Sequence, residues 1–143
     1  MKLNYLCPAH RTWLFSDNEK VEYYWHIWMD TADYFCQSNA IDQALPYLGY
    51  AFELAEYALT QRYPSHATAT HRFTYSSLLL AMAYQYQLDT DGQYYIIEQA
   101  QKRLEREITA SKSTEHVSLC LRQLTINSET TTSSHRVRHS ALH

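Results

Sequence analysis

The sequence predicts an all-α protein of about five helices, arranged as antiparallel helical hairpins. The 143 residues include only 2 glycines and 3 prolines, too few for the many tight turns of a β-sandwich, a barrel or a doubly wound sheet. Apolar residues recur at spacings of three and four, which is the period of an amphipathic helix. A hydrophobic share of 45% beside a charged share of 19% is enough to build the core of one folded domain.

The N-terminal half predicts an irregular segment over residues 1–17 followed by two helices. The first helix covers 18–37, where the apolar positions follow the helical period. The second runs from an expected cap at Asp42 to about Arg62. It ends before Pro64, because a proline forces the preceding residue out of the helical conformation.

Three further helices are predicted in the C-terminal half, beginning between Ser65 and Thr70, at about residue 93 and at 111–114. The last one carries a weaker apolar set than the others. The segment 128–143 contains seven Ser or Thr among sixteen residues and no aromatic residue. Such a composition buries too little apolar area to offset the entropy of ordering, so a disordered tail is expected there. The helical domain is therefore predicted over 18–127.

Small and bulky residues alternate within two helical hairpins in a recurring order. In the first unit these are Trp28, Ala32, Phe35, Ala44, Leu48 and Ala51, and in the second they are Leu80, Ala81, Tyr84, Ile97 and Ala100. This arrangement resembles the tetratricopeptide repeat. The resemblance implies hairpins stacked as a short right-handed superhelix, and a plain helical bundle is the alternative. In both cases the alanines are expected inside, where they let the helices approach closely.

The resemblance also implies that the first helix of each unit lines a concave groove. The inward positions would be His26, Met29, Asp30, Asp33 and Gln37 in one unit and Tyr75, Leu78, Leu79, Met82, Gln85 and Tyr86 in the other. A mixed surface of rings, thioethers, amides and carboxylates suits a peptide segment or helix of a partner protein. We therefore expect a non-catalytic interaction module, acting as an adaptor, chaperone or regulator. The two aspartates favour a partner of basic or apolar character.

The sequence is also compatible with two other occupants of this groove. The chain's own N-terminal segment or fifth helix could fill it. Alternatively, a second copy of the chain could cover it, which would make the protein a homodimer with a structural or regulatory role.

A metal-dependent or acid–base enzyme ranks behind these interpretations. Cys7 and His10 have the two-residue gap of a zinc half-site, but a structural zinc needs four ligands and no second close pair follows. His26, Asp30 and Asp33 share one helix face and could take part in proton transfer, but a charged surface that faces solvent or a peptide is the favoured interpretation. We expect no metal and no cofactor.

Composition also argues against several partners and locations. A formal net charge of −3 does not supply the basic surface that nucleic acids need. The sequence contains no run of 18 apolar residues, so it predicts no membrane span. Polar residues interrupt the N-terminal segment before the apolar core of a signal peptide forms, so no signal peptide is predicted. Three widely spaced cysteines cannot form a complete disulfide framework, so a reducing cytoplasm is the expected location.

Overall fold

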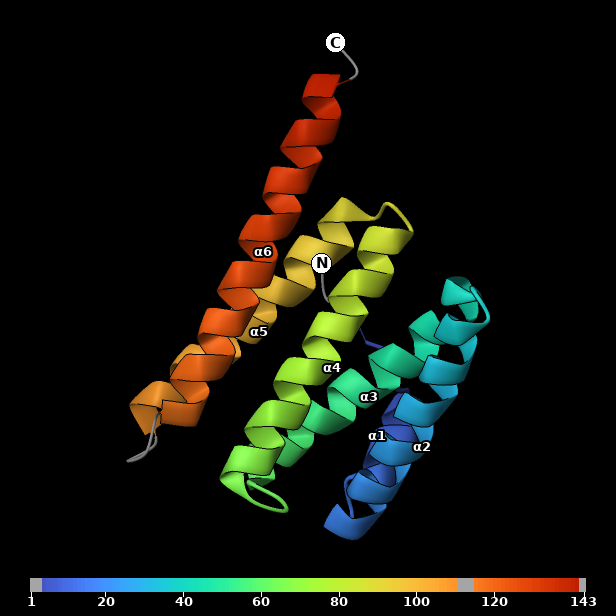
Figure 1. Cartoon of the computed structure of the whole chain (residues 1–143). Coiled ribbons are helices and arrows are strands. Elements are labelled where there is room, and N and C mark those ends of the chain that lie inside the picture. Colours follow the sequence, from blue (N-terminus) through green and yellow to red (C-terminus); the bar gives the residue numbers. More distant parts are fainter. Residues whose placement is uncertain (1–3, 111–114, 142–143) are drawn as a thin grey trace.

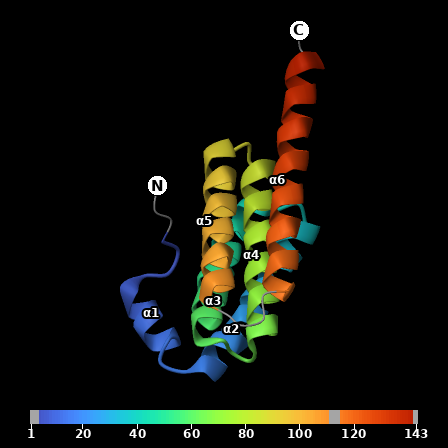
Figure 2. The same cartoon turned by 90° about the vertical axis from the view of Figure 1, so that its left-hand side faces the viewer.

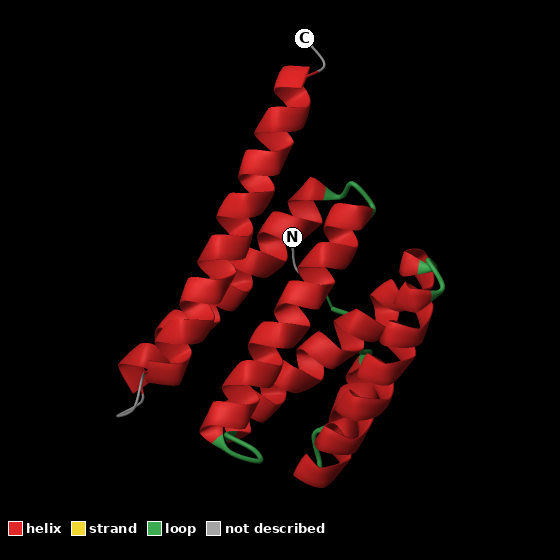
Figure 3. Cartoon of the chain, viewed as in Figure 1, coloured by secondary structure: helices red, strands yellow, loops and turns green. Residues whose placement is uncertain are grey.

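The computed structural model describes residues 4–110 and 115–141, with side chains described as far as residue 129. This part contains helices and no strand (Figure 3). The helices are α1 (Pro8–Leu14), α2 (Asn18–Gln37), α3 (Ile41–Gln61), α4 (His66–Tyr86), α5 (Thr90–Ala110) and α6 (Glu115–Ala141). They pack in sequential order as antiparallel neighbours, and α6 also packs against α4 (Figure 1). The all-α prediction is confirmed, with six helices in the described residues rather than about five.

The additional helix, α1, lies inside the segment that the sequence predicts to be irregular. Pro8 begins it, at a position where a missing backbone N–H costs nothing because the first N–H groups of a helix have no partner within it. Leu14 of α1 is buried with Leu6, Val21 and Leu54 in a small core of its own. The sequence could not indicate α1, because seven residues are too few to display a helical period.

Two helix starts agree with the sequence because a side chain caps each of them. The Asp17 carboxylate accepts the backbone N–H of Glu19 at 3.0 Å and begins α2. The Ser65 hydroxyl accepts the backbone N–H of Thr68 at 3.2 Å and begins α4. Each cap satisfies one of the N–H groups that the first turn leaves without a partner.

Two other starts are earlier than predicted. Ala40, rather than Asp42, is the residue before α3, and Asp42 lies in the first turn, where the helix dipole favours a negative charge. α5 begins at Thr90, ahead of the predicted start at about residue 93, and the Asp89 carboxylate accepts the backbone N–H of Gly92 at 2.9 Å. The predicted opening of the next helix at 111–114 lies outside the described residues.

The core contains the five alanines that the sequence places inside. Ala32, Ala44, Ala51, Ala81 and Ala100 have exposed fractions between 0% and 3%. Their prediction as interior residues is confirmed. Larger side chains such as those of Phe73, Leu80 and Leu104, all fully buried, fill the remaining space between the helices.

α6 extends further than the sequence predicts. It continues through 128–141, where the sequence predicts a disordered tail, and this part projects beyond the other helices (Figures 1 and 2). Val117, Cys120 and Leu124 are buried in the main core and hold the first part of α6. Once packing has formed those turns, each further residue adds one backbone hydrogen bond without a new nucleation step. Residues 142–143 of the expected tail lie outside the described residues.

Candidate functional site

A groove of about 520 Å³ lies between α2 and α4, with α3 at its base. Its walls run from Trp25 to Cys36 on α2 and from Tyr75 to Tyr86 on α4. Two contacts connect the helices at one end of the groove: Arg72 pairs with Glu22 at 3.0 Å, and the Trp25 ring N–H donates to the Ser76 hydroxyl at 2.9 Å. The Arg72 guanidinium also lies 5.0 Å from the centre of the Trp25 ring. These contacts fix the separation of α2 and α4, and therefore the width of the groove.

The structure brings most of the residues predicted for the concave side into this groove. Those that line it are His26, Met29, Asp30 and Asp33 from α2 and Tyr75, Leu79, Met82 and Tyr86 from α4. Their helical spacing puts them on one face of each helix. The parallel course of α2 and α4 on either side of α3 then turns these faces toward each other (Figure 1).

Three predicted residues lie elsewhere. Gln37 does not line the groove, but its side-chain amide donates to the Asp33 carboxylate at 2.8 Å and so orients that group. Leu78 and Gln85 border a much smaller cavity of about 50 Å³ between α4, α5 and α6, which they share with Met82. The sequence places them in the groove because they share a helix face with Met82, and it does not show that α6 packs along that side of α4.

The sequence also missed five lining residues: Trp25, Cys36, Ile41, Leu48 and Ala83. Trp25 and Leu48 carry the pattern of core residues, and both do pack against the core. Cys36 lies one turn after Asp33 on the same helix face, so its spacing from Asp33 is sufficient to predict that it lines the groove. Ile41 belongs to the first turn of α3, and its direction depends on the turn between α2 and α3.

The two walls of the groove differ in character. On α2, Asp30 and Asp33 are exposed carboxylates. On α4, Tyr75, Met82 and Tyr86 are 53%, 58% and 63% exposed. No Lys or Arg is among the described lining residues. The groove therefore attracts positive charge on one side and apolar side chains on the other.

The titratable groups of the groove are not assembled into an acid–base site in the described structure. Burial, with a smaller effect from the charge of Asp33, raises the pKa of the Cys36 thiol, which stays protonated at neutral pH. His26 approaches Glu22 at 3.9 Å, and no hydrogen bond joins it to Asp30 or Asp33. The predicted combination of His26 with the two aspartates is therefore absent from the described contacts.

The described parts of the chain leave the groove open. The Tyr5 ring of the N-terminal segment lies against Gly49 on α3, where any Cβ atom would overlap the ring, and its hydroxyl contacts that of Tyr84. α6 packs against α4 and α5 instead of α2. The expectation that the N-terminal segment or the last helix fills the groove is therefore wrong for the described residues.

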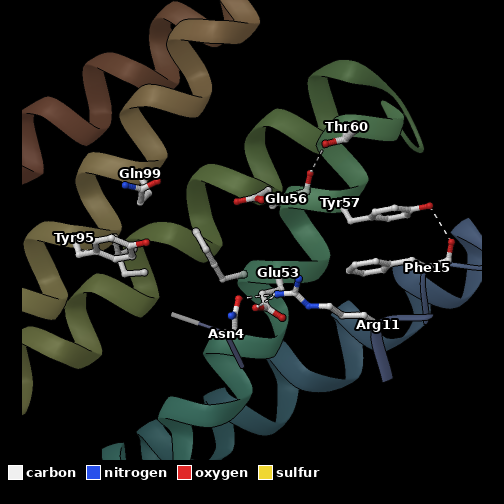
Figure 4. A pocket seen from close by; sticks show the side chains of 11 residues that line it. Asn4, Arg11, Phe15, Glu53, Glu56, Tyr57, Thr60, Tyr95 and Gln99 are labelled. Atoms are coloured by element: carbon white, nitrogen blue, oxygen red, sulfur yellow. Dashed lines mark hydrogen bonds and ion pairs between the residues drawn. The ribbon is translucent and has the colours of Figure 1, made fainter. Parts of the chain in front are cut away.

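A second cavity, of about 410 Å³, lies between the N-terminal segment, α3 and α5 (Figure 4). Two of its charged groups, Arg11 and Glu53, are paired with each other. Arg11 of α1 reaches Glu53 of α3 at 2.6 Å and Asn4 at 3.2 Å. The Glu53 carboxylate also accepts the backbone N–H groups of Tyr5 and Leu6, each at 3.0 Å. This site therefore anchors the N-terminal segment, and we take the groove between α2 and α4 as the candidate functional site.

Within the described residues, no additional ligand joins the predicted zinc half-site. Cys7 and His10 are exposed at the start of α1. Cys36 lines the groove, and Cys120 of α6 is buried in the main core. In the residues described, no three or more His, Cys, Asp or Glu side chains come together as a metal site.

Comparison with known proteins identifies no family. No family model, curated protein or solved structure matches the chain. None of the described helices combines the length and the hydrophobicity needed to cross a membrane.

Proposed function

We propose that this protein is a non-catalytic interaction module that binds a segment of a partner protein in the groove between α2 and α4. The observation that supports this is an open groove with exposed Tyr and Met side chains on one wall and the exposed carboxylates of Asp30 and Asp33 on the other. We further propose that the hairpins of α2–α3 and α4–α5 stack in the manner of tetratricopeptide repeats. Such an assembly would present α2 and α4 on its concave side and act as an adaptor, chaperone or regulator.

The dimensions and charge of the groove suggest a short amphipathic segment as its occupant. At a rise of about 1.5 Å per residue, the lining runs about 16 Å along α2, from Trp25 to Cys36, and about 16 Å along α4, from Tyr75 to Tyr86. This length fits two to three turns of a partner helix. Lys or Arg on one face would meet Asp30 and Asp33, while Leu, Phe or Met on the other would pack on the α4 side.

A double substitution in the groove is expected to weaken binding about 100-fold, because hot-spot side chains contribute on the order of 1–2 kcal/mol each. Wild-type protein is first used to select binders from a displayed library of helical peptides. The selected peptides should combine basic and large apolar residues. Their affinity for D33K/Y86A protein is then measured by fluorescence anisotropy, with circular dichroism to verify that the helices are intact.

The matched control is E105K/Y23A, because both residues are exposed and lie outside the groove. This variant carries the same change of charge type and the same loss of a ring, and it should bind like the wild type. Equal binding by D33K/Y86A, or selected peptides without basic residues, would show that the groove is not the binding surface.

Self-association through the same groove is the second candidate, supported by the exposed apolar wall on α4. Charge argues against it, since a symmetric dimer would bring Asp30 and Asp33 of two acidic chains together. Light scattering over a range of concentrations separates the two proposals. A dimer that D33K/Y86A disrupts would favour self-association.

The three free thiols support our additional proposal of a reducing, cytoplasmic location.

A further inference from the structure

A group of titratable side chains connects three helices at one end of the molecule. It lies where α4 and α6 begin and α5 ends (Figure 1). The His66 Nε2 atom is 2.8 Å from a Glu107 carboxylate oxygen, and the Nδ1 atom of the same ring is 2.9 Å from the His116 Nε2 atom. Arg103 also donates a hydrogen bond to Glu107. A continuous series of contacts therefore runs from α5 through α4 to α6.

The contact between the two imidazole rings limits how many protons the pair can hold. A hydrogen bond between two ring nitrogens needs one that carries a proton and one that does not. The Nε2 atom of His66 faces a carboxylate and donates to it, so its Nδ1 atom accepts from His116 while the His66 ring is neutral. If the His66 ring becomes cationic, His116 can accept instead. When both rings are cationic, two N–H groups face each other and no hydrogen bond forms.

The surroundings tolerate the first positive charge on this pair and oppose the second. Both rings lie in the first turn of a helix, where the helix dipole disfavours a cation. The other titratable or charged groups around them are His71 on α4, Arg103 and Glu107 on α5, and Glu115 and Cys120 on α6. Only Glu107 accepts a hydrogen bond from the pair, and Arg103 already neutralises part of its charge. Burial, followed by the charges of His66 and His71, lowers the pKa of His116, and Glu115 opposes this shift.

We infer that the His66–His116 contact is a pH-sensitive clasp that holds the start of α6 against α4 and α5 and opens when both rings are protonated. Opening would separate Val117, Cys120 and Leu124 of α6 from the core in which they are buried. The Cys120 thiol lies 3.5 Å from the His71 Nδ1 atom, and burial raises its pKa, so it stays neutral throughout this change. The clasp does not involve the groove and does not depend on the function proposed for it.

The direction of the pH effect follows from which state binds more protons. A released α6 has an ordinary histidine at position 116, with a pKa of 6.5, whereas the docked ring has a lower pKa. Docking is therefore complete above pH 6.5 and weakens as the pH falls below it. Burial acts to raise the pKa of Glu107, but hydrogen bonds from Arg103 and His66 hold it below its ordinary 4.5. The contribution of Glu107 is consequently lost only at more acidic pH.

Hydrogen–deuterium exchange of the full chain tests the clasp. Exchange rates at pH 7.5 and 5.5 are corrected for the intrinsic effect of pH on amide exchange. Protection of the amides of 117–124 should fall severalfold between these values, to at most the tenfold change that one histidine with an ordinary pKa of about 6.5 in the open state can produce. Protection of the amides of 48–59 in α3 should change less than twofold.

The variant H116Q removes the titration while leaving an amide that can donate to the His66 Nδ1 atom. Its protection over 117–124 should differ less than twofold between the two pH values. H26Q is the matched control, since His26 is exposed on α2 and outside the cluster, and this variant should retain the wild-type change in protection. Protection that is independent of pH in the wild type, or a wild-type change that persists in H116Q, would overturn the proposal.

A titration of the histidine rings by NMR gives a second test that does not require H116Q to dock α6. In wild-type protein, one ring of the His66–His116 pair should resist protonation to a pH below the ordinary histidine value of 6.5. If both rings of the pair take up protons with this ordinary value, no clasp exists.

Discussion

Replacing Glu53 with alanine is expected to lower the free energy of unfolding by about 3 kcal/mol and to release the N-terminal segment from α3. The Glu53 side chain is only 8% exposed and accepts the backbone N–H groups of Tyr5 and Leu6. Its removal leaves both N–H groups without an acceptor, at a cost of about 1–3 kcal/mol each. Arg11 loses its ion-pair partner as well, but its side chain is 39% exposed, so water still hydrates the charge. The lost ion pair therefore adds little to the decrease in the free energy of unfolding.

Urea unfolding measures this loss, and hydrogen exchange over residues 5–14 measures the release of the segment. E56A is the matched control, since Glu56 lies three residues further along the same helix and is exposed. Its effect should stay within about 0.5 kcal/mol. The loss of unfolding free energy in E53Q should lie between those of E53A and E56A, because the amide of glutamine retains one acceptor oxygen. Full protection of 5–14 in E53A would show that the carboxylate does not anchor the segment.

Local sequence patterns account for most of the fold and for the walls of the groove. The start of α2 is a capping side chain followed by regularly spaced apolar residues, and both signals lie within a few positions of each other. His26, Met29, Asp30 and Asp33 share one face of α2, and the resemblance to tetratricopeptide repeats predicts that this face lines a groove. The α4 wall is predicted in the same way. The spacing within a single helix shows which residues share a face, and the resemblance predicts which face is concave.

The features that the sequence did not predict depend on contacts between distant residues. Glu53 is a charged residue within an otherwise apolar helix, and the partners that explain it lie 42 to 48 positions earlier in the chain. The contact between His66 and His116 spans 50 positions. Leu78 was misassigned for the same reason, since only the packing of α6 decides which side of α4 stays open. A composition rich in Ser and Thr likewise cannot show that 128–141 continue a helix that packing has already started.

Replacing Phe73 with alanine is expected to lower the free energy of unfolding by about 3–5 kcal/mol. Phe73 is fully buried on α4, and its ring centre lies 5.6 Å from that of Phe52 on α3. Deleting the ring loses its transfer free energy and leaves a cavity between helices whose alanines already hold them close together. F73L should cost less than half as much, because most of the volume is retained. Urea unfolding monitored by circular dichroism measures both variants.

Tyr75 provides the control for Phe73 and separates folding from binding. It lies two residues further along α4, on the groove side, and its ring is 53% exposed. Y75A should change the free energy of unfolding by less than about 0.5 kcal/mol, since it creates no buried cavity. It should nevertheless weaken the binding of groove-selected peptides about tenfold, because the ring forms part of the α4 wall. A loss of stability in Y75A equal to that in F73A would mean that the groove wall belongs to the core and is not free to bind a partner.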